Sequence, residues 1–316
     1  MEGLADDVLR DVLTRAAGYD WCVTEFIRVS GTLLPYRAFR RVARELLNGA
    51  RTDAGTPVRV QLMGSDPACL AENAARLAEL QPAGIDLNFG CPAPLVNRHR
   101  GGAALLGEPE LLNRIVTAVR AVVPPAMPVT AKMRLGIADT ALAIACALAL
   151  EAGGAQEIVV HGRTKADGYR PPARWEWIAR IREAVTVPVI ANGEVWNVTD
   201  YRDMCAVSGC TDAMLARGAV ADPFLVARIR GEKETLPTPA DWQVLSPLIA
   251  AFWSQVLVKV EARHAPGRLK QWLNLLRRNF AEAEVLYGRV RELRSAADVS
   301  AALATEYPYL EQPLAA

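Results

Sequence analysis

Between residues 20 and 218 the sequence alternates short runs rich in Val and Ile with longer segments of helical period. This alternation is typical of repeated βα units on a parallel sheet. Asp66 and Asp139 are predicted to cap two of the helices. The pattern predicts an α/β fold of the (β/α)8 TIM-barrel class. The expected strands cover residues 21–26, 58–62, 84–88, 129–133, 157–161, 187–192 and 212–215, and the expected helices lie near 4–17, 66–80, 109–122, 139–152, 175–185 and 198–207.

Seven strands are visible where such a barrel has eight, and the chain opens directly with a loop and a helix. The strand that is missing or truncated is therefore the first. A barrel without it exposes two unpaired strand edges, which is an aggregation hazard. We therefore expect the natural start of the protein to lie upstream of Met1.

The C-terminal quarter has a different pattern. After a short expected helix at 222–230, Leu236-Pro237-Thr238-Pro239 indicates a linker. From 241 to about 304 the period is helical only, with apolar residues three to four positions apart. We expect a catalytic barrel over 1–236 and a small all-helical domain over 240–316.

The charges nearly cancel, with 36 Lys and Arg against 35 Asp and Glu, so the whole chain has no bulk attraction to nucleic acid or membranes. A basic surface must be local. The helical tail has five cations and no acidic residue between positions 263 and 278: Arg263, Arg268, Lys270, Arg277 and Arg278. A solvated helix face is the commoner explanation for such a run.

The six cysteines include no CxxC pair and have no histidines at zinc spacing, so neither a disulfide framework nor a metal site is indicated. The most apolar run, 141–150, is far shorter than the roughly 20 residues of a membrane span. The acidic start Met1-Glu2-Gly3 is no signal peptide. We expect a soluble, cytoplasmic protein without a metal, and a monomer.

Polar side chains stand at the carboxyl end of nearly every expected strand, where a barrel of this class forms its active site. A single such residue could be a buried polar group of the core, but here each of six consecutive strands ends in at least one polar residue. They form a predicted binding and catalytic face: Gln61, Asn88, Lys132 with Arg134, His161 with Arg163, Asn192 with Glu194, and Arg217.

The last two strands are followed by Asn192-Gly193-Glu194 and Ala216-Arg217-Gly218. Many barrels bind a phosphate on backbone N–H groups at these positions. The first interpretation is a phosphate-bearing cofactor, with Lys132 and Arg217 as cations for its negative charge. A phosphosugar substrate is the competing interpretation.

Cys91 lies in Asn88-Phe89-Gly90-Cys91-Pro92, on a loop just past a strand. A thiol there can act as a nucleophile or as a proton donor, and the spacing does not decide between them. The other five cysteines fall within helices or strands and are expected to be structural. His161 is the only histidine at a predicted strand end, one strand away from the thiol, so no dyad is inferred.

These motifs resemble, in order and over nearly the whole chain, the tRNA-dihydrouridine synthase family. The matches are Met1-Glu2-Gly3, Val60-Gln61-Leu62, Asn88-Phe89-Gly90-Cys91-Pro92, Lys132-Met133-Arg134-Leu135-Gly136, His161-Gly162-Arg163-Thr164, Ile190-Ala191-Asn192-Gly193-Glu194 and Arg217-Gly218-Ala219. Within that family, the segments 24–29, 168–170 and 268–273 are similar to the bacterial C-type enzymes, which modify position 16 of the D-loop.

The resemblance implies an FMN-dependent, NADPH-fed reduction of the C5–C6 double bond of a uridine in tRNA, with hydride to C6 and a proton from Cys91 to C5. Asn88 and Tyr169 would then touch the uridine, and Arg28, Arg268, Lys270 and Arg277 would contact the tRNA. Ala216 stands where the family has glycine. The implied FMN contacts are Met1, Glu2, Gln61, Lys132, His161, Asn192, Gly193, Glu194, Ala216 and Arg217.

Two other functions stay open on the sequence. An FMN barrel that reduces a small molecule explains the barrel motifs but leaves the basic tail unexplained. A non-catalytic tRNA-binding protein would fit an incomplete barrel that cannot hold flavin. The presence of bound flavin in the purified protein would distinguish the two enzymes from the non-catalytic tRNA-binding protein.

Overall fold

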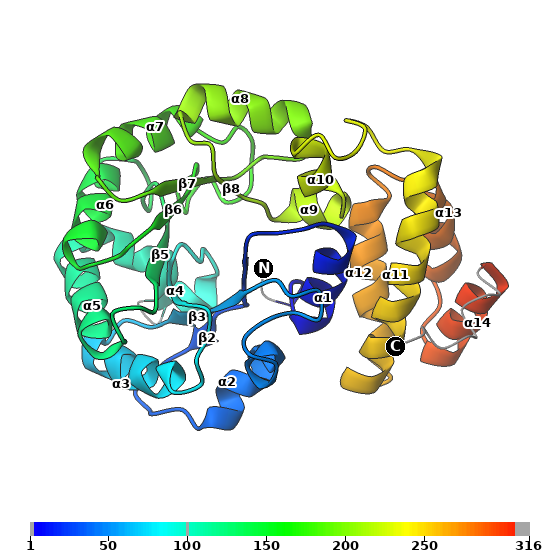
Figure 1. Ribbon diagram of the computed structural model, residues 1–316, viewed down its shortest axis with the longest axis horizontal. Helices are drawn as coiled ribbons and strands as arrows, with labels where there is room; N and C mark the ends of the chain where they lie inside the picture. The colour runs from blue at the N-terminus through cyan, green and yellow to red at the C-terminus, as the bar shows by residue number, and fades with distance from the viewer. Residues whose placement is uncertain (1–2, 99–100, 307–316) are drawn as a thin grey trace.

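The computed structural model describes residues 3–98 and 101–306. Its centre is a curved sheet of eight strands (Figure 1), in the order β1-β3-β4-β5-β6-β7-β8, with β2 also pairing with β3. Every pairing is parallel. The strands are β1 Cys22–Val23, β2 Ile27–Arg28, β3 Val58–Met63, β4 Ile85–Phe89, β5 Val129–Arg134, β6 Ile158–His161, β7 Val189–Asn192 and β8 Ala213–Met214.

Five helices of the βα units follow the curve of the sheet on its outside (Figure 1): α3 Pro67–Ala78, α5 Pro109–Val122, α6 Ala143–Ala152, α7 Trp175–Ala184 and α8 Val198–Ser208. Because helices cover the sheet, β6 and β7 are buried along their whole length. The expected α/β barrel class is confirmed. Within the described residues, no pairing joins β8 to β1 or β2, so the sheet forms an incomplete barrel.

The strand expected at 21–26 was wrong as a single element, because the chain forms β1 and β2 with a break between them. Thr24 causes the break. Its Oγ1 accepts the backbone N–H of Gln61 at 3.1 Å, so a side chain replaces a carbonyl in the ladder. The same hydroxyl donates to the carbonyl of Glu25 at 2.8 Å.

The two predicted helix caps differ in outcome. Asp66 caps α3 as expected, since its Oδ1 accepts the N–H of Cys69 at 2.8 Å. The prediction for Asp139 was wrong, because α6 begins only at Ala143. Asp139 instead accepts the N–H of Ala141 at 3.0 Å, in a turn that packs tightly on Gly136.

The remaining helices lie in the N-terminal segment, in loops of the barrel or in the C-terminal region, which is helical as expected. The N-terminal and loop elements are α1 Asp7–Ala16, α2 Tyr36–Val42, η1 Arg44–Leu47, α4 Pro94–Arg98 and η2 Gly102–Gly107. The others are α9 Arg217–Ala221, α10 Leu225–Ile229, α11 Pro239–Lys259, α12 Ala265–Leu276, α13 Ala281–Val290 and α14 Ala296–Glu306. Thr238 and Asp241 form a capping box at the start of α11.

The apolar residues form two cores. One fills the barrel and its outer helices. The other joins α11, α12, α13 and α14 to α1 and α9, with Leu9, Val12 and Val220 buried in it. Fully buried Trp272 of α12 donates its Nε1–H to the carbonyl of Val220 at 3.1 Å. The helical region therefore packs on α1 and α9, which come from the first and the last parts of the barrel sequence.

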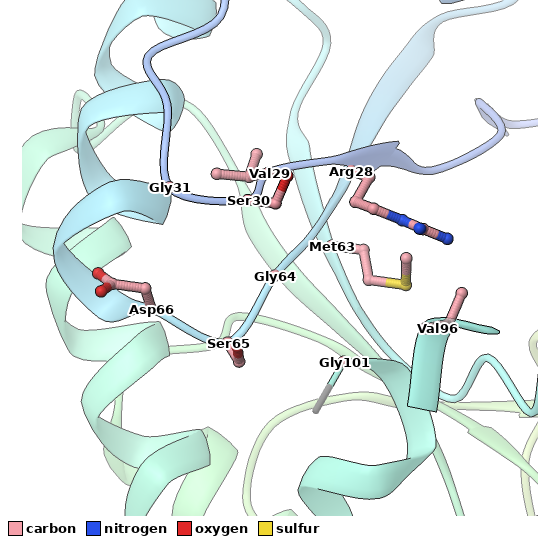
Figure 2. A pocket seen from close by; sticks show the side chains of 10 residues that line it. All are labelled: Arg28, Val29, Ser30, Gly31, Met63, Gly64, Ser65, Asp66, Val96 and Gly101. Carbon is pink, nitrogen blue, oxygen red and sulfur yellow. The ribbon is translucent and has the colours of Figure 1, made fainter. Parts of the chain in front are cut away.

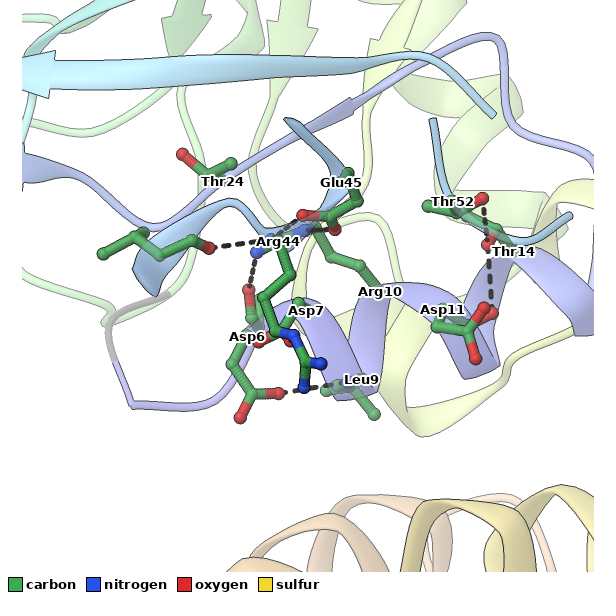
Figure 3. Close-up of polar contacts among 12 residues, drawn as sticks. Asp6, Asp7, Leu9, Arg10, Asp11, Thr14, Thr24, Arg44, Glu45 and Thr52 are labelled. Atoms are coloured by element: carbon green, nitrogen blue, oxygen red, sulfur yellow. Dashed lines mark hydrogen bonds and ion pairs between the residues drawn. The ribbon is translucent and has the colours of Figure 1, made fainter. Parts of the chain in front are cut away.

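Helix α1 is fastened on its other side by buried polar contacts (Figure 3). Arg10 makes a bidentate ion pair with Glu45 of η1, at 2.8 and 2.9 Å, and both side chains are buried. Thr14 donates to Thr52 at 3.0 Å. Toward the tail, Lys259 pairs with Asp6 and Asp7. Helix α1 thus connects the two cores.

Candidate active site at the carboxyl ends of the strands

The register of the parallel strands brings the polar strand ends side by side. Asn88 lies opposite Lys132, and Arg134 lies opposite His161, which in turn lies opposite Asn192. Residues that are 27 to 44 positions apart in the sequence therefore meet on one edge of the sheet.

Gln61 and Asn88 form a connected pair beneath Cys91. Asn88 Nδ2 donates to Gln61 Oε1 at 2.7 Å. The backbone N–H groups of Gly90 and Cys91 both donate to Asn88 Oδ1 at 3.0 Å. Gln61 Nε2 donates to Asp86, a carboxylate that is only 1% exposed. The start of the Cys91 loop is thus held from inside the barrel.

Lys132 is linked to the last two strands. Its Nζ donates to Asn192 Oδ1 at 2.8 Å, and Asn192 Nδ2 donates to the carbonyl of Met214 at 2.7 Å. Burial and, to a smaller extent, the nearby cation Arg134 lower the pKa of Lys132 to about 8, against the opposing effect of Asp86. Burying the charged amine of Lys132 costs free energy, and an anionic or electron-rich ligand in the barrel mouth would offset that cost.

His161 lies in a cluster of positive charge. Burial lowers its pKa to about 2, and the charges of Lys132, Arg134, Arg163 and Arg217 act in the same direction. The imidazole is therefore neutral, and its buried Nδ1 has no hydrogen-bond partner among the described residues. A buried polar atom among four cations fits a ligand that carries a phosphate and hydrogen-bonding ring atoms.

The loop after β7 is shaped by Gly193 and Glu194, both of which have positive φ, 113° and 66°. A Cβ on Gly193 would lie 3.4 Å from His161 Nε2, so the loop backbone at Gly193 passes close to the imidazole. Glu194 forms an ion pair with fully buried Arg163, and its Oε1 accepts the indole N–H of Trp196 at 3.0 Å.

Arg217 begins α9 after β8 and lies between two aromatic rings. Its guanidinium is 4.9 Å from the ring centre of Tyr169 and 5.0 Å from that of Trp196. Arg278, just beyond α12, also lies over the ring of Trp196, with its guanidinium 4.1 Å from the ring centre. The tail thereby contributes a cation next to the barrel mouth.

The Cys91 loop is held by further contacts. The carbonyl of Cys91 accepts from Asn97 Nδ2 at 2.9 Å and from the N–H of Ala103 at 3.0 Å. Gly102, with φ 59°, lies so close that a Cβ would be 2.7 Å from that carbonyl. The thiol residue is half-buried and interacts electrostatically with Arg134.

A pocket of about 90 Å³ lies beside this loop (Figure 2). It is lined by Arg28 and Met63 at the ends of β2 and β3, and by Val96 and Gly101 of the segment that follows Cys91. A typical small-molecule site has roughly 300 to 1,000 Å³, so this pocket is too small to hold a cofactor by itself. Arg28 is exposed at its edge.

The predicted tRNA-binding cations of the tail form hydrogen bonds and ion pairs within the protein. Arg268 pairs with Asp6 at 2.9 Å and also bonds to the carbonyls of Gly3 and Leu4. Lys270 donates to the carbonyl of Leu293 at 2.5 Å. Arg277 is more exposed and forms a surface pair with Glu284. Met1 and Glu2, two predicted cofactor contacts, lie outside the described residues.

Sequence reasoning missed Asp86, Trp196 and Arg278. A carboxylate inside the apolar strand Ile85-Asp86-Leu87 was a signal for the first. Trp196 closely follows Glu194 in the loop after β7. Arg278 belonged to the basic run but had no feature that placed it at the barrel mouth.

Within residues 3–98 and 101–306, no group of three or more His, Cys, Asp or Glu side chains is arranged to hold a metal ion. Over the same residues, no helix is both long and apolar enough to cross a membrane.

The fold and the strand ends define an α/β-barrel protein with a cationic mouth that bears one loop cysteine. The chain belongs to the dihydrouridine synthase family, whose model, described as "Dihydrouridine synthase (Dus)", matches residues 1–299. It is 55% identical over 299 residues to the tRNA-dihydrouridine(16) synthase of Ralstonia nicotianae, covering 95% of this chain and 92% of that protein. It is 57% identical over 292 residues to the protein of the same name in Pseudomonas syringae pv. tomato, covering 92% of each.

A solved structure shares the fold. A complex of 2-naphthoyl-CoA reductase superposes with a TM-score of 0.56 at 11% identity, over 72% of this chain and 46% of that one. At this identity the likeness concerns the barrel architecture alone.

Proposed function

We propose that the protein reduces the C5–C6 double bond of a uridine in the tRNA D-loop, at position 16, to 5,6-dihydrouridine. The names of the relatives support the substrate and the position. The observation that carries the chemistry is the Cys91 loop, held by Asn88 next to the cationic cluster around His161. We expect it to act in the cytoplasm as a monomer.

The cofactor in this proposal is FMN, with NADPH as the electron donor. When bound and reduced, FMN supplies the hydride for C6. Lys132 and Arg217 provide positive charge for it, and neutral His161 provides a hydrogen-bonding nitrogen. Gly193 and Ala216 offer backbone near the phosphate. Gln61, Asn192 and Glu194 complete the described part of the expected set, to which Met1 and Glu2 also belong.

Cys91 is the proposed general acid. Its S–H bond breaks as a C5–H bond forms, and the thiolate regains a proton from water. Asn88 positions the loop and, with Tyr169, holds the uridine. Tyr169 is 57% exposed and lies over Arg134 and Arg217, a suitable surface for a base turned out of its stack.

The tRNA body is proposed to rest on the helical domain over 240–316, while the barrel over 1–236 carries out the reduction. Arg28, beside the Cys91 loop, and Arg277 are proposed to contact the RNA directly. Arg268 and Lys270 also belong to this surface. Because Arg268 holds Gly3, Leu4 and Asp6, its contribution includes fixing the N-terminal segment.

Deleting the gene and mapping dihydrouridine in tRNA tests this function. We expect dihydrouridine to disappear at position 16 alone and to return with a plasmid copy, but not with Cys91→Ala. Unchanged tRNA from the deletion strain, with flavin present in the purified protein, would favour a small-molecule reductase. Purified protein that cannot bind flavin would favour a non-catalytic tRNA-binding protein.

A further inference from the structure

A line of hydrogen bonds runs through the barrel interior to the Cys91 loop. Thr130 Oγ1 donates to one carboxylate oxygen of Asp86, and Gln61 Nε2 donates to the other, both at 2.6 Å. Gln61 Oε1 then accepts from Asn88 Nδ2, whose amide oxygen accepts the N–H of Cys91. The line joins β5, β4 and β3 before it reaches the loop.

The chemistry of the line fixes its direction. An ionised carboxylate can only accept, so Gln61 must turn its Nε2 toward Asp86 and its Oε1 toward Asn88. Asn88 must then present Nδ2 to Gln61, which leaves its Oδ1 for the backbone of the loop. An amide can be turned either way in an otherwise symmetrical site, and its neighbours decide which way it lies.

Asp86 holds this order from one end of the line, and the backbone N–H groups of Gly90 and Cys91 hold it from the other. Asp86 is 1% exposed, and both of its oxygens have donors. Burial raises its pKa, while the bonds from Thr130 and Gln61 favour the ionised form. An apolar residue here would leave the buried donors of Thr130 and Gln61 without an acceptor, so a test of the role of Asp86 must keep the size and polarity of the side chain.

We propose that Asp86 is a positioning residue that orders the amides of Gln61 and Asn88 and thereby sets the position of Cys91 at the barrel mouth. This inference rests on the proposed function for its catalytic meaning. It predicts that removing the constraint at the Asp86 end will move the thiol even when the volume of every side chain is nearly kept.

A double-mutant cycle removes this constraint. In Asp86→Asn the new amide can still turn its oxygen to Gln61, because its Nδ2 can donate to the hydroxyl of Thr130. In Thr130→Val the carboxylate still accepts from Gln61. Only in the double variant does Asn lack a polar partner on the Thr130 side, so nothing there holds its oxygen toward Gln61, and the order of the two amides is no longer imposed from this end of the line.

The readout is the alkylation rate of Cys91 by iodoacetamide in the purified full chain, measured peptide by peptide by mass spectrometry. It needs neither tRNA nor NADPH, so a failed reductase assay would leave the result readable. We expect each single variant to change the Cys91 rate by less than about twofold and the double variant by about fivefold or more, the signature of coupled residues. Cys69 on α3, also half-buried, serves as the internal control and should keep its rate.

A Cys91 rate in the double variant equal to the product of the single effects would overturn the proposal, as would equal changes at Cys69 and Cys91. If the double variant does not fold, adding Gln61→Glu decides. Its carboxylate accepts from both neighbouring amides and restores the orientation of Asn88. A wild-type Cys91 rate in this triple variant supports the relay, and an altered rate or an unfolded triple variant contradicts it.

Discussion

Lys132 illustrates at the scale of one residue how the site opposes stability. Its amine lies among protein atoms with some contact to solvent, beside Arg134 and opposite the oxygen of Asn192. Its pKa of about 8 means that the folded protein binds its proton less tightly than the unfolded chain, for which the ordinary value is 10.5. Folding therefore carries a cost while the amine stays charged.

Replacing Lys132 with Met should therefore stabilise the flavin-free protein in a pH-dependent way. Between pH 8 and 10.5 the unfolded wild type binds more protons than the folded one, so its stability rises with pH in that window. The advantage of Lys132→Met should be largest below pH 8, at most about 3 kcal/mol, and shrink by pH 10.5. Urea unfolding of both proteins at several pH values measures it, and a difference that is constant with pH would contradict the assignment.

Cys91→Ala should separate binding from chemistry. We expect it to keep bound flavin and its rate of reduction by NADPH, because the thiol is not among the proposed flavin contacts. Turnover on tRNA should fall by about 10² to 10⁴, the usual contribution of a general acid. Stopped-flow absorbance and dihydrouridine analysis measure the two steps. Cys69→Ala is the matched control, and full turnover in Cys91→Ala would remove the thiol from the mechanism.

At the scale of elements, the start of α9 depends on a close approach between two loops. A Cβ on Gly218 would lie 2.1 Å from the carbonyl of Val195 in the loop after β7. This contact keeps Arg217 next to Trp196 and Tyr169. The two loops proposed to hold the phosphate are thus positioned by one glycine.

Gly218→Ala should push these loops apart. We expect a loss of about 2 kcal/mol or more in stability and a clearly weaker affinity for FMN, since overpacking at a rigid backbone contact is destabilising. Gly267→Ala in α12 is the matched control, because nothing lies within 4 Å of its added methyl group and alanine favours a helix. Thermal melts and flavin titration compare them. Equal affinities for FMN would show that the contact does not shape the site.

Much of the barrel could be predicted from sequence, because runs such as 157–161 and 187–192 are rich in Val and Ile and have the length of a strand. The break at Thr24 could not, since it depends on a side-chain contact with Gln61 on another strand. The strand-end residues could be predicted because parallel strands end at one edge. The contacts of Arg268 and Arg278 could not, because they join segments more than 80 residues apart.

At the scale of the whole molecule, α1 joins the barrel to the helical tail. It contributes Val8, Leu9 and Val12 to the core that α11 and α12 complete, while Arg10 is bound to Glu45 beneath it. The domain boundary expected near 236–240 falls between helices α10 and α11. The residues of this core, however, come from both sides of that boundary.

A chain that ends at residue 236 should therefore fold poorly. It would uncover Leu9, Val220 and Phe224 and the ring of contacts around them. We expect a broad thermal transition and strong binding of a hydrophobic dye, as in states that lack fixed packing. Calorimetry beside a chain that ends at residue 306 tests this. A sharp transition with bound flavin in the shorter chain would show that the barrel is independent.

The most direct test of the whole account is reduction of a defined tRNA by the purified protein. The protein, FMN and NADPH are mixed with an unmodified transcript that carries uridine at position 16 and, separately, with one that carries cytidine there. The account predicts one dihydrouridine, at position 16, in the first transcript and none in the second. Oxidation of NADPH by a flavin-loaded protein that leaves every uridine unchanged would contradict it.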